Sequence, residues 1–129
     1  MTSSILLLSF SLIGTSTHPR EISTISRIKP HTELLRGERN AERDLPRTNL
    51  WTLRSDPKAG ESVGDHWRTI EKDLLSNIDA FRRFAAECRA VMTIVISGEV
   101  NRCPPIEIPP SMSFFAGAIG ATIDVDHLQ

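Results

Sequence analysis

SVGDHWRTIEKDLLSNIDAFRRFAAEC, residues 62–88, is the segment that decides the predicted fold of this chain. Its apolar residues recur at helical spacing: Val63, Trp67, Ile70, Leu74, Ile78, Phe81, Ala85 and Cys88. Charged residues lie between them, so one side of the segment is solvated and the other must pack on another element. Ser62 with Asp65 is typical of a helix start, and Ser76-Asn77 offers a second cap in the middle. We therefore expect two helices, at about 62–75 and 77–87.

Segments with the alternation of β-strands lie on both sides of these helices. Residues 5–13 and 49–54 alternate between two faces, and Trp51 of the second is expected in the core. Residues 90–97 are rich in β-branched side chains and form the clearest strand. Residues 122–127 close the chain as a strand. Residues 106–108 are flanked by prolines, which fits only a short edge strand.

Two further helices are expected outside the central segment. Thr17 caps the first, over residues 19–28, and its buried side carries Ile22, Ile25 and Ile28. Ser111 caps a last short helix that ends at Gly120, where a left-handed stop belongs. Between the first helix and the second strand, residues 31–48 are dominated by charge and read as a surface loop.

The resulting order is β-α-β-α-α-β-β-α-β in a single domain spanning residues 1–129. It predicts an α+β fold: an open, four- to five-stranded, mainly antiparallel sheet with its helices on one face, similar in layout to ferredoxin-like domains. The other sheet face is then uncovered. By alternation it carries Leu7, Ser9, Ser11, Leu50, Thr52, Arg54, Val91, Thr93, Val95, Thr122, Asp124 and Asp126. A face that is half apolar and half small and polar favours an interaction surface.

Charge and hydropathy exclude some classes of partner. The chain has 15 basic and 16 acidic residues among 129, a net charge of −1, so no long-range field draws in nucleic acid. The apolar stretch of residues 5–13 resembles a signal-peptide core, but no Lys or Arg precedes Arg20 and no A-x-A site follows. We interpret it as a strand, too short to span a bilayer, in a cytoplasmic protein; a targeting role for residues 1–17 stays open.

The candidate chemistry is sparse. Asp124 and Asp126 point the same way on a strand and could share a ligand or a basic partner, although a solvated face explains them equally well. Arg36, Arg39 and Arg43 in the charged loop are a candidate contact surface, but acidic residues interrupt the series. The four histidines and two cysteines show no metal-ligand spacing, so no metal and no cofactor are expected.

Several short features, in order and spacing, resemble a bacterial family of uncharacterised proteins catalogued as the domain of unknown function 4279. They are Pro19-Arg20-Glu21-Ile22, Ile28-Lys29-Pro30, Arg36-Gly37-Glu38, Trp51, His66-Trp67, Ile106-Glu107-Ile108-Pro109 and Gly120-Ala121 before Ile123-Asp124-Val125-Asp126. The resemblance implies a small intracellular α+β protein and transfers no catalytic residue. An immunity-type role, as partner of a secreted toxin, is an analogy at the level of such small proteins.

Two functional hypotheses follow. The first is a non-enzymatic domain that binds a protein partner, or its own copy, through the open sheet face (Arg54, Thr93, Val95, Asp124 and Asp126) and the charged loop. The alternative is a small-ligand or hydrolytic site between the loop and Asp124/Asp126, which requires a concave pocket there. The lack of a catalytic set favours the first hypothesis.

Overall fold

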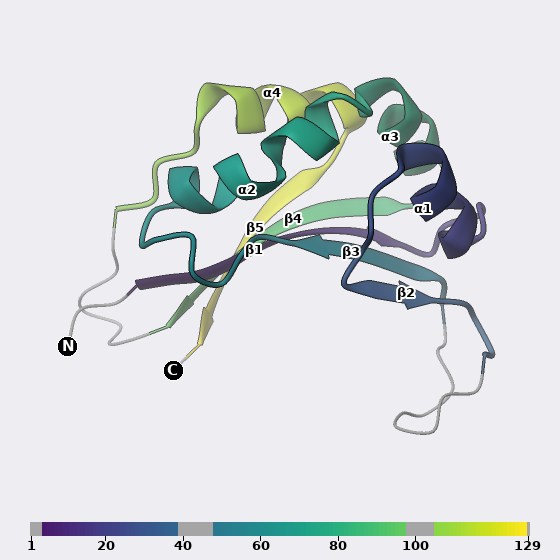
Figure 1. Cartoon of the computed structure of the whole chain (residues 1–129), viewed down its shortest axis with the longest axis horizontal. Coiled ribbons are helices and arrows are strands. Elements are labelled where there is room, and N and C mark those ends of the chain that lie inside the picture. Colours follow the sequence, from purple (N-terminus) through teal and green to yellow (C-terminus); the bar gives the residue numbers. More distant parts are fainter. Residues whose placement is uncertain (1–3, 39–47, 98–104, 129) are drawn as a thin grey trace.

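Four helices lie on one face of a five-stranded sheet in the computed structural model of the chain, which describes residues 4–38, 48–97 and 105–128 (Figure 1). In chain order the elements are β1 (Ser4–Ile13), α1 (Pro19–Ser26), β2 (Thr32–Leu34), β3 (Leu50–Arg54), α2 (Val63–Leu75), α3 (Ile78–Ala85), β4 (Arg89–Ser97), α4 (Pro110–Ile119) and β5 (Thr122–Leu128). The predicted α+β class is confirmed.

The sheet is open, with the strand order β2-β3-β1-β4-β5. Its neighbouring strands pair antiparallel except β4 and β5, which are parallel because α4 carries the chain from one to the other. β1 lies at the centre and pairs with β3 on one side and β4 on the other. β2 and β5 are the two edges, so residues 32–34 and 122–128 lie on opposite sides of the sheet.

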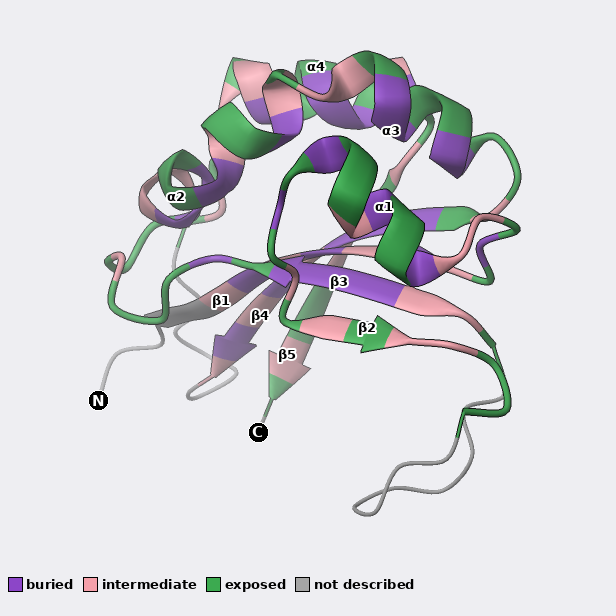
Figure 2. Cartoon of the chain, turned by 45° about the vertical axis from the view of Figure 1, so that its right-hand side comes forward, coloured by how far each residue is buried: buried purple, intermediate pink, exposed green. Residues whose placement is uncertain are grey.

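An aromatic cluster fills the space between the sheet and the helices. Phe10 of β1 is fully buried, and its ring contacts the rings of Trp51, Phe81 and Phe115 at centroid distances of 6.3, 5.3 and 5.4 Å. These partners come from β3, α3 and α4, so one side chain of the central strand joins three other elements. Figure 2 shows the buried side of the helices turned toward the strands and their exposed side turned away.

The central segment forms the two expected helices. The Ser62 side chain accepts a hydrogen bond from the backbone N–H of Asp65, which caps α2 as predicted. Asn77 precedes α3 but makes no capping bond with its side chain. Its amide instead donates to the carbonyls of Ser26 and Asp73, which fixes the junction of the two helices against the end of α1.

The first helix begins at Pro19 as predicted, but its capping residue and its last residue differ from the prediction. His18, not Thr17, is the N-cap, and its Nδ1 accepts from the backbone N–H of Arg20. The helix ends at Ser26 because Arg27 adopts a left-handed conformation. Its buried stripe follows Pro19, Ile22 and Ser26, so Ile25 lies off the stripe and is 46% exposed.

The predicted edge strand at residues 106–108 is absent, and the edge opposite β5 is β2 instead. Pro105 and Pro109, on either side of this segment, offer no N–H to a ladder, and Ile106 packs on the core without pairing. The backbone of Thr32–Leu34 pairs with β3, inside the segment that the charge pattern had marked as loop. Three residues are too few for a visible alternation.

Ser111 is not the N-cap of the last helix, contrary to the prediction. Pro109 occupies that position with Pro110 after it, so the helix begins with a preset φ. The Ser111 hydroxyl instead donates a hydrogen bond to the carboxylate of Glu71 on α2. The indole N–H of Trp67 donates to Ser111 Oγ at 2.8 Å and to the Glu71 carboxylate at 2.9 Å. Gly120 ends α4 in the left-handed conformation, as predicted.

Candidate binding face

The sheet face turned away from the helices is the candidate site. The strand register places its side chains in cross-strand rows. We call this surface the open face; its described residues are Leu7, Ser9, Ser11, Ile13, Thr32, Leu34, Leu50, Thr52, Arg54, Arg89, Val91, Thr93, Val95, Ser97, Thr122, Asp124, Asp126 and Leu128. All twelve residues predicted for this face are among them.

The middle of the open face is lined by short side chains, most of which carry a hydroxyl group. Thr32, Thr52, Ser11, Val91 and Thr122 follow one another across the five strands. The hydroxyls of Ser11 and Thr52 hydrogen-bond at 2.9 Å, and Thr52 is buried although no helix covers it. The centre of the face is therefore low in relief, because its side chains are short.

The next row carries opposite charges at its two ends. We call it the Arg54 row; it consists of Arg54, Ser9, Thr93 and Asp124 on β3, β1, β4 and β5. Arg54 is exposed, and Asp124 is half-exposed with a carboxylate oxygen 3.7 Å from the Arg89 guanidinium. The two ends are three strand spacings apart, about 14 Å. A partner that covers this row therefore meets a positive end and a negative end.

A cavity of about 400 Å³ lies beyond the Arg54 row. Its walls are mostly apolar and are made by Leu7, His31, Arg54, Ser55, Pro57, Val95 and Leu128. Leu7 and Val95 pair across β1 and β4 next to the Arg54 row. The sequence could not indicate His31 and Pro57 as neighbours of this surface, because His31 reaches it from the segment before β2 and Pro57 from the loop after β3.

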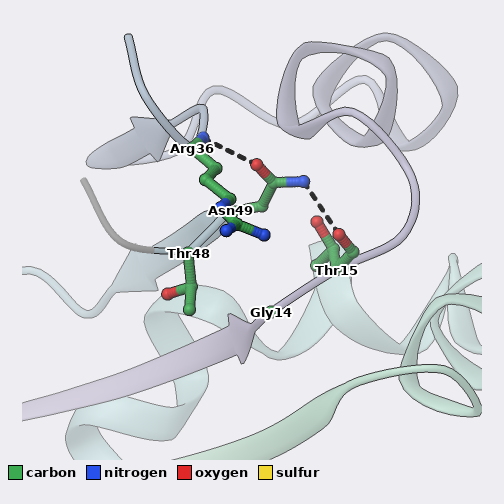
Figure 3. Close-up of a pocket in the computed structure, with 5 residues that line it drawn as sticks. All are labelled: Gly14, Thr15, Arg36, Thr48 and Asn49. Atoms are coloured by element: carbon green, nitrogen blue, oxygen red, sulfur yellow. Dashed lines mark hydrogen bonds between the residues drawn. The ribbon is translucent and has the colours of Figure 1, made fainter. Parts of the chain in front are cut away.

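A second cavity, of about 280 Å³, lies near the start of β3 and is lined by Gly14, Thr15, Arg36, Thr48 and Asn49 (Figure 3). The Asn49 side chain organises it, accepting from the backbone N–H of Arg36 at 2.8 Å and donating to the carbonyl of Thr15 at 2.8 Å. Arg36 thus borders a concave surface. Arg39 and Arg43, the other predicted loop contacts, lie outside the described residues.

The alternative hypothesis places a small-ligand site between the charged loop and Asp124/Asp126, but the described part of the loop and the two aspartates lie far apart in the sheet. Residues 32–38 follow the β2 edge, whereas Asp124 and Asp126 lie on β5 at the opposite edge. The two carboxylates line neither of the two cavities described above. Neither of these two cavities therefore joins Asp124 or Asp126 to the described residues of the loop.

A buried Ser-His pair joins β1, the segment after β3 and α2. Ser55 and His66 are 1% and 0% exposed, with Oγ 2.7 Å from Nδ1. The hydroxyl accepts from the N–H of Leu8 at 2.9 Å, so its own proton is free for Nδ1, while Nε2 donates to the carbonyl of Gly60 at 2.9 Å. Hydrogen bonds within the core therefore hold both side chains in place. Among the described residues no three His, Cys, Asp or Glu side chains gather as a metal site.

Cys88 is expected to react slowly. Burial raises the pKa of its thiol, the nearby charge of Glu87 acts in the same direction, and a hydrogen bond from the Ile13 backbone opposes them. A raised pKa leaves less thiolate near neutral pH. In a Cys103→Ser background, alkylation by iodoacetamide at pH 7.5 should be about 10-fold slower than for an unstructured cysteine peptide, and the pH midpoint of the rate should be higher. A rate equal to that of the peptide would contradict this assignment.

Among the comparisons with known proteins, a match was found to one family model. In the described parts of the chain, no helix has the length and apolar character needed to cross a membrane. Searches of the curated proteins and of the solved structures found no match. The family model described as Domain of unknown function (DUF4279) matches residues 3–129. The chain therefore belongs to the DUF4279 family.

Proposed function

We propose that this protein is a non-enzymatic interaction module of the bacterial cytoplasm that binds a folded protein partner through its open face. The observation that carries the proposal is the character of this face: an uncovered five-stranded surface with short hydroxyl side chains in the middle, apolar side chains toward both ends, and both signs of charge in one row. A folded surface of matching relief fits it better than a small molecule.

The size of the open face supports a protein partner. Five strands about 4.8 Å apart, with side-chain rows about 6.7 Å apart along each strand, give a surface of about 600 Å². A complex would bury about twice that area, about 1,200 Å², which is the lower end of the range for specific protein interfaces. The apolar ends supply the desolvation energy, and the charged row supplies orientation.

The variant Thr93→Arg/Val95→Glu tests the proposal, because both residues lie in the middle strands of the open face. Covering this face would then bury two unmatched charges, so partner affinity should fall about 100-fold. The matched control, Thr24→Arg/Val125→Glu, makes the same chemical changes on α1 and on the helix side of β5, where Thr24 is exposed and Val125 is 51% exposed. Circular dichroism and thermal melting establish that both variants fold.

Site-specific photo-crosslinking supplies the partner measurement. A photoreactive residue at position 93 should give a discrete adduct in the native cell, and one at position 24 should not. Mass spectrometry of the adduct then identifies the partner, and a toxin would establish the immunity-type role. Position 93 giving no adduct, or the same adducts as position 24, would overturn the proposal.

A further inference from the structure

We infer that the partner of the open face is a second copy of this chain, related by a two-fold axis that runs along the strands between β1 and β4. This inference rests on the proposed function, because it names the partner of the same face. It is carried by the arrangement of charge in the Arg54 row and by the apolar side chains next to it.

The Arg54 row is complementary to itself under this rotation. An axis between β1 and β4, parallel to the strands, exchanges β3 with β5 and β1 with β4 when two open faces meet. Each row then faces the same row of the other copy. Arg54 lies over Asp124 of the second copy, and the reverse contact forms by symmetry. Two ion pairs thus follow from one row, as a two-fold interface requires.

Neighbouring residues fit the same arrangement. Asp126 lies two residues beyond Asp124 on β5, about 7 Å further along the strand, so both carboxylates approach the long Arg54 side chain of the second copy. In the adjacent row Leu7 lies over Val95 of the second copy, and the cavity at this end offers room for these side chains. Ser9 lies over Thr93, so the middle of the Arg54 row carries no bulky residue.

The charges of the face are balanced, which suits a partner with an identical surface. Among its described residues the open face carries Arg54 and Arg89 against Asp124 and Asp126. Two identical faces with a net charge would repel, whereas a balanced face with separated signs attracts its own copy in one register. In this arrangement β2 faces no strand of the second copy, so the four facing strands bury about 1,000 Å² in total, which is the size of a weak dimer interface.

Charge reversal tests the inference without requiring either variant to bind by itself. Arg54→Asp alone places two like-charge contacts in the dimer, and Asp124→Arg alone does the same with the opposite sign. Each variant should dimerise 10- to 100-fold more weakly than the unmodified chain at about 50 mM salt. A mixture of the two variants should form a heterodimer of nearly full affinity, because both contacts are again between opposite charges.

The control makes the same reversals on the helix layer. Asp79 and Arg82 form an exposed pair on α3, 3.4 Å apart, and Asp79→Arg or Arg82→Asp should leave dimerisation unchanged. Sedimentation equilibrium over about 1 μM to 1 mM gives the affinities, and native mass spectrometry of isotope-labelled variants counts homodimers and heterodimers.

The outcomes separate this inference from the proposed function. A chain that stays monomeric up to about 1 mM overturns the second-copy inference, while an adduct with another protein at position 93 would still support the proposed function. A dimer that Thr93→Arg/Val95→Glu dissociates but charge reversal does not would overturn the two-fold arrangement alone. A dimer that neither set of variants weakens would form through another surface and would overturn the second-copy inference. The expected result is weaker dimerisation of each charge-reversal variant alone and nearly full dimer affinity in the mixture of the two.

Discussion

Phe10→Ala is expected to lower the free energy of unfolding by about 3–5 kcal/mol, the usual cost of removing a fully buried aromatic ring. Phe10 is 0% exposed and lies between Trp51, Phe81 and Phe115, so its removal leaves a cavity bordered by four elements. The surrounding rings belong to different elements and cannot close this space without moving the helices over the sheet. Urea denaturation followed by circular dichroism measures the change.

Phe114→Ala is the matched control for this prediction. Phe114 precedes Phe115 on α4 but is 63% exposed, so the same truncation should cost less than about 1 kcal/mol. Equal losses in the two variants would mean that the aromatic cluster does not hold the helices to the sheet as the structure indicates.

Ser55→Ala is expected to cost about 2–4 kcal/mol, an unusually large effect for the loss of one hydroxyl group. The change leaves two buried groups without partners: the N–H of Leu8, which donates to Ser55 Oγ, and Nδ1 of His66, which hydrogen-bonds to it. Leu8 and His66 are both 0% exposed in the folded chain. Chemical denaturation of the variant gives the loss.

A double-mutant cycle with His66→Ala distinguishes this network from simple loss of packing. The two changes should not add, because Ser55→Ala already breaks the hydrogen bond that His66→Ala removes, and the coupling should be about 1–2 kcal/mol. Ser113→Ala, on the exposed side of α4, should be nearly neutral. If the losses in unfolding free energy of Ser55→Ala and His66→Ala simply added in the double variant, the two side chains would have no coupling free energy.

Most elements could be predicted from sequence because their signals are local. The helical spacing of residues 62–88, the cap at Ser62, the stop at Gly120 and the alternation of β1 and β4 each depend on neighbours within a few residues. The same alternation correctly assigned the twelve predicted residues to the open face. Their role in binding remains a prediction.

The errors share one cause, which is that tertiary contacts outweigh weak local signals. Ser111 looked like a helix cap but is held by Trp67 and Glu71 of another helix. Thr32–Leu34 read as charged loop and became a strand because the free edge of β3 accepts its backbone groups. Ile25 lies outside the buried side of α1, because only the narrow side formed by Pro19, Ile22 and Ser26 is turned toward the sheet.

Local patterns are enough to predict the α+β class, the long helices and the two faces of each strand, because periods of two and 3.6 residues depend only on nearby side chains. The neighbours of each strand are seen only in the folded chain. That order places Arg54 and Asp124 at two ends of one row and puts Thr32–Leu34 and the two aspartates at opposite edges. Strand order depends on contacts between residues far apart in the chain, which no local pattern encodes.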